Sequence, residues 1–223
     1  MAATVDAPTQ SAPAKTTSAP AAPGWFANPV NRYLTIGGGV VLIALVAWFI
    51  TLSNSRKETF GFQALDQARN AAEAGNFAQA ASDLQNVITT YSGSRAAAEA
   101  TIVLNQVRLL NGQHELAVVG LQDFIKGNPP ADYLAPANGL LGRSFENAKR
   151  PADAATAYLA ASKAADVDYL KASYLLDVAR NQAAAGKKDE AIATYRQILD
   201  TYKKTNAVTE AEIRLAELTG GAM

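Results

Sequence analysis

The sequence predicts an all-α protein: an α-solenoid of about four helical hairpins with a C-terminal capping helix, preceded by a single transmembrane helix. Three observations support this prediction. A loop pattern recurs every 37 residues, and the apolar residues that follow each loop keep helical offsets instead of the period of two of a strand. In addition, one run of 20 residues near the N-terminus carries no charge.

The composition excludes several functional classes. The 223 residues include 20 basic and 20 acidic residues, one histidine and no cysteine. A chain without net charge lacks the basic excess that neutralises nucleic-acid phosphates, and a chain without cysteine has neither disulfides nor thiolate metal sites. A single histidine cannot supply a two-histidine metal site. We therefore expect no nucleic-acid partner, no metal and no cysteine chemistry.

The N-terminal segment, residues 1–24, consists of alanine, proline, serine or threonine at 18 of its 24 positions. Such a segment has too little apolar surface to offset the entropy lost on ordering, and its four prolines interrupt helices. We expect a disordered leader over residues 1–24.

Residues 25–57 are predicted to form a transmembrane anchor with its flanks. As a helix, the uncharged run YLTIGGGVVLIALVAWFITL (33–52) covers the roughly 30 Å of a bilayer's hydrocarbon core, and aromatic residues lie towards both ends. The alternatives are a buried core helix and a cleaved signal peptide, for which Ser53 and Ser55 would form the small-residue site. The length of the apolar run favours a retained anchor. Basic residues lie on both sides of the run and therefore predict no orientation.

Small residues cluster in the first half of this run. Thr35, Gly37, Gly38 and Gly39 would allow a second transmembrane helix to approach closely. Glycine is also common in membrane helices that do not pair, so both interpretations stay open.

The remaining segment, residues 58–223, is organised as a repeat. The loops GNFAQA (75–80), GQHELA (112–117), KRPADA (149–154) and GKKDEA (186–191) end in an alanine at intervals of 37 residues, and three of them begin with glycine. Glycine adopts the left-handed conformation that ends a helix, and alanine lets two helices pack closely. Apolar or aromatic residues follow each alanine at offsets of four and seven, which gives each second helix one apolar face.

This repeat predicts four helical hairpins and a final helix that covers the last apolar face. The hairpins are expected at 60–91, 94–127, 131–164 and 167–203, and the capping helix at 206–218.

The loop pattern resembles that of the tetratricopeptide repeat. Pro129 occupies the place of that motif's closing proline, and Gly142 matches its first-helix glycine. The period of 37 differs from the 34 residues typical of the motif. The layout of leader, single span and four repeats is similar to the bacterial ancillary subunit of the Sec translocon. That resemblance implies a single-pass protein of the bacterial inner membrane with a periplasmic repeat domain that binds proteins.

No catalytic constellation is recognisable. His114 lies in a loop position that holds unrelated residues in the other repeats, and we expect it in a solvated turn. The sequence lacks a nucleophile elbow, a phosphate-binding loop and a dinucleotide fingerprint. We therefore expect no enzymatic activity, no cofactor and no small-molecule substrate.

One set of residues suggests a binding surface. Arg69, Gln106, Arg143 and Arg180 share one repeat position, which the resemblance places in a concave groove. Arginines there could grip carboxylates of an extended peptide. Apolar contacts would come from residues one turn earlier: Leu65, Ile102 and Leu176. The alternative, which we weight more heavily, is pairing within each helix: Arg69 with Glu73, Arg143 with Glu146 and Arg180 with Asp177.

These observations predict a non-catalytic, membrane-anchored scaffold or chaperone-like adaptor that binds other proteins, membrane or exported proteins among them. The alternative is a dedicated structural or assembly subunit of a larger bacterial membrane complex.

Overall fold

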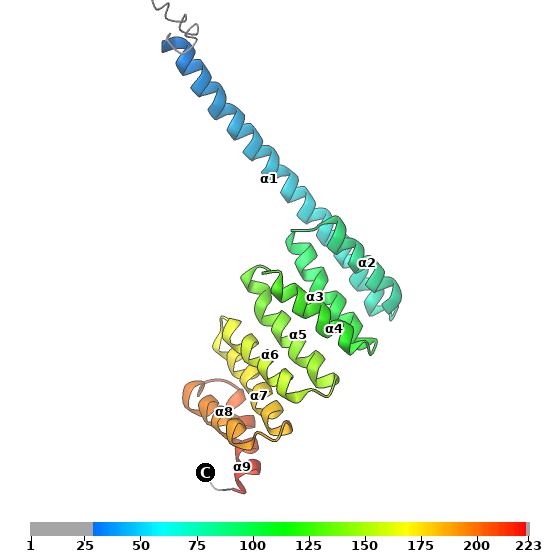
Figure 1. Ribbon diagram of the computed structural model, residues 1–223, viewed down its shortest axis with the longest axis vertical. Helices are drawn as coiled ribbons and strands as arrows, with labels where there is room; N and C mark the ends of the chain where they lie inside the picture. Colours follow the sequence, from blue (N-terminus) through cyan, green and yellow to red (C-terminus); the bar gives the residue numbers. More distant parts are fainter. Residues whose placement is uncertain (1–28, 222–223) are drawn as a thin grey trace, which may run out of the picture. The chain divides into compact units, whose positions relative to one another are not determined.

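The computed structural model describes residues 29–221, and every regular element within that range is helical. This confirms the all-α prediction. The expected leader, 1–24, lies outside the described residues. The α-helices, labelled in Figure 1, have the following bounds: α1 Pro29–Glu73, α2 Phe77–Thr90, α3 Arg95–Leu110, α4 His114–Lys126, α5 Leu134–Asn147, α6 Pro151–Ala164, α7 Asp168–Ala184, α8 Lys188–Thr201 and α9 Ala207–Thr219. A short 3₁₀ helix, η2 Ala131–Tyr133, precedes α5.

The chain divides into two compact units, and α1 contributes to both, with the boundary between Thr51 and Leu52. Residues 53–60 contain neither glycine nor proline, the residues that interrupt helices, and α1 continues across this boundary without a break. The described part of the first unit is the helical stretch 29–51.

By length and composition, α1 qualifies as a candidate membrane span. An 18-residue window within Tyr33–Glu73 has a mean hydropathy of 2.2, and none of that window is buried. Large apolar side chains along it are exposed, for example Leu42 at 64% and Phe49 at 67%. The buried core helix considered above is therefore wrong for the described residues, whereas an N-terminal signal sequence would satisfy the same criteria.

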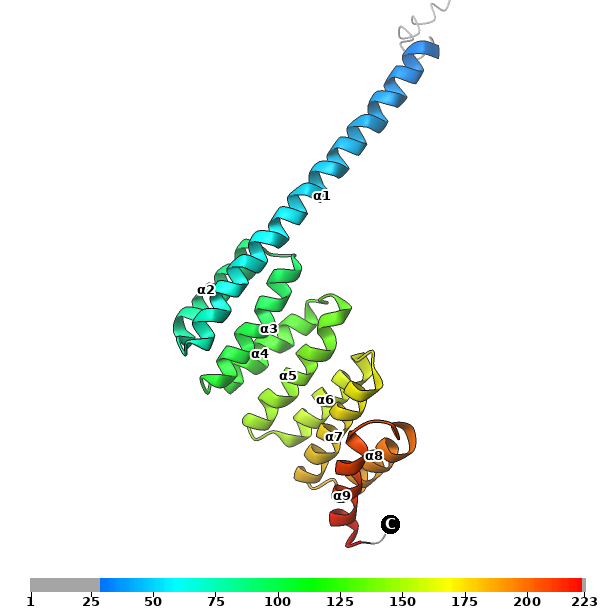
Figure 2. The ribbon, with the colours of Figure 1, turned by 180° about the vertical axis from the view of Figure 1, so that it is seen from behind.

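The second unit consists of four helical hairpins and a capping helix. Residues 52–73 of α1 pair with α2, and the pairs α3–α4, α5–α6 and α7–α8 follow, with α9 packed on α7 and α8. Figure 2 shows these helices stacked in chain order. The start predicted at residue 60 is wrong, because α1 runs unbroken through it; the other observed helix ends lie within a few residues of the predicted ones, and the solenoid prediction is confirmed.

The four loops inside the hairpins share one backbone conformation. Their left-handed residues have φ values of 78°, 74°, 61° and 79°, and these residues are Gly75, Gly112, Lys149 and Gly186. In each loop the next amide donates to the carbonyl five residues earlier, as in the 2.9 Å bond from Arg150 to Phe145. This bond is the signature of a Schellman motif, which satisfies carbonyl groups at the end of the first helix.

The core confirms the predicted packing of the second helices. The regularly spaced alanines are fully buried: Ala80, Ala117, Ala154 and Ala191. Four residues after each of them lies a buried leucine or tyrosine. Gly142 is equally tightly packed, because a Cβ atom there would lie 2.8 Å from the ring of Tyr158. The small residues are thus required by close approach of neighbouring helices.

The last helix, α9, ends the solenoid. One of its faces is buried through Ala207, Ala211 and Leu215. Its exposed face carries charged residues, among them Glu212 and Arg214. This division matches the capping role that the sequence predicts.

Candidate functional site

The candidate site is the surface on the first helix of each hairpin, here called the first-helix face. Its repeated position holds Arg69 in α1, Gln106 in α3, Arg143 in α5 and Arg180 in α7. Of the successive first helices, α3 packs on α5, whereas side-chain bonds link α1 to α3 (Arg69 to Glu99) and α7 to α5 (Arg180 to Glu146). The repeat therefore aligns these four side chains along neighbouring helices.

Arg69 is paired within the molecule. Its guanidinium donates to Glu99 of α3 and lies 3.6 Å from Asp66 of its own helix. Arg69 therefore pairs with Asp66 and Glu99 and not with Glu73, the partner that the sequence suggested. The pair with Glu99 links the first two hairpins.

Arg180 belongs to a polar network that links α5, α6 and α7. Its Nη2 donates to Asp177 Oδ1 at 2.7 Å, which confirms the predicted pair, and to Glu146 Oε1 at 3.1 Å. Glu146 also accepts bonds from the Tyr158 hydroxyl (2.8 Å) and from Asn181 Nδ2 (2.6 Å). Both oxygens of this carboxylate are therefore engaged by residues of other helices.

The two carboxylates of this network respond differently to their surroundings. Burial acts to raise the pKa of Glu146, but the three hydrogen bonds that it accepts, one of them from a cation, outweigh burial and lower its pKa. Burial raises the pKa of Asp177 above its ordinary value, although the Arg180 guanidinium opposes this. Glu146 is thus the carboxylate that the fold stabilises in its ionised form.

Arg143 differs from the other two arginines. Its side chain is exposed, and it forms no ion pair with any residue in the described range. The expected pair with Glu146 is wrong, because the Glu146 carboxylate is occupied by α6 and α7. Gln106 is also exposed. Arg143 and Gln106 are therefore the members of the set whose side chains bond no other residue in the described range.

The apolar members of the predicted site require one correction. Leu65 is fully buried in the core of the first hairpin and cannot contact a partner while the domain is folded. Ile102 and Leu176 are half-buried and pack partly against the core. Two exposed apolar residues were not foreseen: Leu110, exposed at 65%, and Ile213, exposed at 54%. Ile213 follows Leu176 by 37 residues, so the repeat period could have identified it.

Among the pockets of the described residues, two lie between the C-terminal ends of neighbouring first helices. One, of about 280 Å³, lies between α1 and α3; its lining residues are Arg69, Ala72, Glu73, Val103, Gln106, Val107 and Leu110. The other, of about 440 Å³, lies between the ends of α5 and α7; its lining residues are Glu146, Lys149, Pro151, Arg180, Asn181 and Ala184. Arg69 and Gln106 thus share one pocket and Arg180 lines the other.

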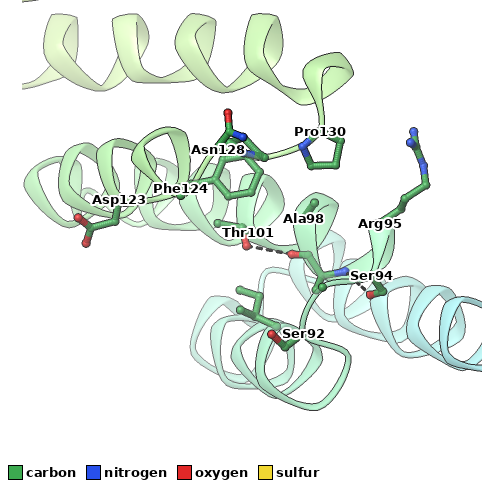
Figure 3. A pocket seen from close by; sticks show the side chains of 14 residues that line it. Ser92, Ser94, Arg95, Ala98, Thr101, Asp123, Phe124, Asn128 and Pro130 are labelled. Atoms are coloured by element: carbon green, nitrogen blue, oxygen red, sulfur yellow. Dashed lines mark hydrogen bonds between the residues drawn. The ribbon is translucent and has the colours of Figure 1, made fainter. Parts of the chain in front are cut away.

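A third pocket, of about 380 Å³, lies at the opposite ends of the helices and is shown in Figure 3. Its wall includes the first turn of α3, where Ser94 accepts a 3.0 Å bond from the Ala97 amide. The Glu58 carboxylate accepts the amides of Arg95 and Ala96 at 2.8 and 3.3 Å. The donors at this helix end are therefore already satisfied by the chain itself.

His114 is not in a solvated turn, which corrects the prediction. It is the first residue of α4, its side chain is half-buried, and its Nδ1 is buried without a hydrogen-bond partner among the described residues. The equivalent positions Phe77 and Pro151 are half-buried too. The imidazole thus occupies a packing position. Within residues 29–221 no group of three His, Cys, Asp or Glu side chains is arranged to hold a metal ion.

The small residues of the apolar stretch lie on an exposed helix surface. A Cβ atom added at Gly37, Gly38 or Gly39 would meet nothing within 4 Å, and the Thr35 hydroxyl donates to the Asn31 carbonyl at 2.9 Å. Within the described residues this surface is not packed against another element.

Comparisons with known proteins agree with this architecture. A family described as "Tetratricopeptide repeat-like domain" matches residues 49–177, and one described as "Tetratricopeptide repeat" matches residues 174–205. Among solved structures, MamA (41-end) from Desulfovibrio magneticus RS-1 is similar, with a TM-score of 0.52 and 16% identity over 64% of this chain and 76% of that chain.

A second similar structure is a putative kinesin light chain with nearly identical TPR-like repeats from Podosopora anserina. Its TM-score is 0.58 at 16% identity, over 71% of this chain and 85% of that chain. No curated protein matches the sequence. At this level of identity the two structures show a common fold.

Proposed function

Because the chain belongs to the family of tetratricopeptide repeat-like domains, whose members are generally non-catalytic and bind other proteins, we propose that it is a membrane-anchored scaffold or chaperone-like adaptor. In this proposal, partner proteins bind along the first-helix face. The partners are membrane proteins or exported proteins.

The observation that carries the proposal is the exposure of Gln106 and Arg143 at one repeated position of neighbouring helices. A guanidinium group without an intramolecular partner can bind a carboxylate through two parallel hydrogen bonds. The side-chain amide of Gln106 can donate to and accept from an extended main chain. Together they offer polar contacts at regular intervals along a partner segment.

Membrane attachment is the second part of the proposal. The apolar half of α1 supplies a candidate span, and the layout of the chain resembles the ancillary subunit of the Sec translocon. We therefore place the protein in the bacterial inner membrane with its repeats in the periplasm. Confinement to the membrane would raise the effective concentration of the repeats towards membrane partners.

Site-specific photo-crosslinking in host cells tests the binding face. A photoreactive residue at Arg143 should give discrete adducts with partner proteins. The matched control is Arg196, which is exposed on the second helix α8 and therefore lies outside the first-helix face. Equal adduct patterns at both positions, or none at Arg143, would reject the proposed face.

Attachment and orientation need a separate test. The full chain should remain in the membrane pellet after alkaline carbonate extraction. In sealed vesicles of known orientation, added protease should cleave the repeat domain when the periplasmic side faces outward. It should leave the repeat domain intact when that side faces inward. Release into the supernatant would contradict a retained anchor.

A second candidate function is a dedicated subunit of one membrane complex. The exposed Gly37–Gly39 surface in α1 favours it, because small residues allow another transmembrane helix to approach closely. Purification in mild detergent separates the two candidates. A fixed set of stoichiometric partners would support the subunit, whereas many substoichiometric partners would support the adaptor.

A further inference from the structure

The two pockets between first helices occupy equivalent positions of the repeat. Gln106, Val107 and Leu110 of the pocket between α1 and α3 precede Arg180, Asn181 and Ala184 of the pocket between α5 and α7 by 74 residues, which is two periods. The same surface position therefore forms a pocket twice. The chemistry of the two linings differs, and this difference defines what each can bind.

The first pocket, here called the apolar pocket, is lined mainly by aliphatic side chains. Ala72, Val103, Val107 and Leu110 form most of its wall, and Leu110 is exposed at 65%. The remaining lining residues are Arg69, Glu73 and Gln106. An exposed leucine at the rim of a concave apolar surface gains free energy when a partner's apolar side chain removes it from water. The pocket therefore suits one aliphatic or aromatic side chain.

The second pocket, here called the polar pocket, is lined by two cations and by the Glu146 carboxylate, both oxygens of which already accept hydrogen bonds within the fold. Lys149 has an ammonium group and makes no ion pair within the described residues. Arg180 bonds Glu146 and Asp177 through Nη2 alone, so its Nε and Nη1 groups make no hydrogen bond within the described residues. Unused donors on two cations suit a carboxylate.

The spacing between the pockets fits a short extended segment. Directly packed helices, such as the first helices α3 and α5, lie roughly 8–10 Å apart, and two such steps from first helix to first helix separate the pockets by roughly 16–20 Å. An extended chain advances about 3.3 Å per residue and covers this distance in about five or six residues. The exposed Arg143 lies on α5, one of the two first helices that border the polar pocket.

We propose that the two pockets bind one extended partner segment, with an aliphatic or aromatic side chain in the apolar pocket and a carboxylate about five or six residues away in the polar pocket. This inference rests on the proposed function, since it assigns the partner chemistry of the same face. It also gives the bound segment a fixed direction, because the two pockets are not interchangeable.

A peptide selection tests the inference. The full chain in mild detergent is exposed to a displayed library of random twelve-residue peptides, and bound peptides are sequenced. The expected result is enrichment of peptides with one large apolar residue and one Asp or Glu separated by about five or six positions. A selected peptide is then labelled, and its dissociation constant is measured by fluorescence anisotropy.

Two variants assign the two preferences to the two pockets. Leu110→Ser should weaken the labelled peptide about tenfold and remove the apolar preference while keeping the acidic one. Lys149→Gly should weaken binding of the labelled peptide about fivefold and remove the acidic preference. This substitution introduces glycine at a loop position that is already glycine in the other three loops. The matched controls are Leu116→Ser and Lys188→Ala, which change exposed residues of second helices. Both variants should bind the labelled peptide as tightly as the parent protein does.

Selection of no peptide, or of peptides without this spacing, would overturn the inference. So would equal losses in the variants and in their controls. Neither result would affect the crosslinking at Arg143, which tests the binding face itself. Adducts at Arg143 without the peptide pattern would leave the face as proposed and reject the two-pocket segment.

Discussion

Lys149 should be replaceable by glycine with a gain in stability. It is the only non-glycine residue among the four equivalent loop positions, and its φ of 61° places it in the left-handed region that disfavours side chains. Its backbone makes the same bonds as the three glycines: the Lys149 amide donates to the Glu146 carbonyl at 3.0 Å, and the next amide donates to Phe145. The backbone bonds would therefore be unchanged in the variant.

The magnitude follows from two opposing effects. A non-glycine residue in the left-handed conformation costs about 1–2 kcal/mol. Glycine increases the entropy of the unfolded chain, which costs about 0.4–1 kcal/mol. The central values, about 1.5 and 0.7 kcal/mol, leave a net gain for Lys149→Gly of about 0.8 kcal/mol, or a rise of about 2–3 °C in Tm for a domain of this size.

The reciprocal change provides the control. At Gly186, φ is 79° and an added Cβ would meet no atom within 4 Å, so Gly186→Lys carries only the backbone cost. Its Tm should fall by about the amount that Lys149→Gly gains. Both are measured on the full chain in detergent by thermal unfolding followed with far-ultraviolet circular dichroism. A lower Tm for Lys149→Gly, or no change for Gly186→Lys, would refute the reasoning.

Three further predictions concern the core and the polar network. Gly142→Ala should destabilise the domain by about 1–3 kcal/mol, because its Cβ would lie 2.8 Å from the Tyr158 ring; an unchanged Tm would contradict this packing. Leu65→Ala should cost about 2–5 kcal/mol in urea unfolding, whereas Leu110→Ala, at an exposed position, should cost little; equal losses would contradict the assigned burial. Glu146→Gln should destabilise the domain by about 1–3 kcal/mol at neutral pH. The pKa of Glu146 is lowered in the folded state, so the ionised carboxylate contributes its full stabilisation above the unfolded pKa of about 4.3. This contribution is lost as the pH falls through the pKa of the folded state. The difference in Tm between parent and variant should therefore disappear at acid pH. A difference that stays constant with pH would show that the charge of Glu146 contributes nothing.

The repeat fold was predictable because each of its requirements is local in sequence. Glycine is favoured where a loop residue adopts the left-handed conformation, and alanine is favoured where two helices cross closely. Both recur with the 37-residue period, so their register alone located the hairpins, the buried alanines and the end of the solenoid. The same register assigns Lys149 to a position that is glycine in the other three loops.

The state of the site residues was less predictable, because it depends on contacts between repeats. Leu65 shares a repeat position with Ile102, yet the first is fully buried and the second half-buried. Intrahelical spacing allowed Arg69 to pair with Glu73, but Glu99 of the next hairpin takes that role. These pairings join side chains that lie about 30 residues apart in sequence. The periodicity within one helix does not predict them.

Arg143 shows how such a contact between repeats creates an available group. An isolated α5 would let Arg143 pair with Glu146 three residues later, and the Arg143 guanidinium would then not be free to bind a ligand. In the folded domain Glu146 instead accepts bonds from Tyr158, Arg180 and Asn181, and these partners lie on α6 and α7. Glu146→Gln would keep the side-chain size while removing the charge that holds Arg180. If availability of the cations determines binding, this variant should bind a carboxylate-containing peptide more tightly, although it destabilises the fold. Weaker binding together with lower stability would instead mean that the network serves only to position the helices.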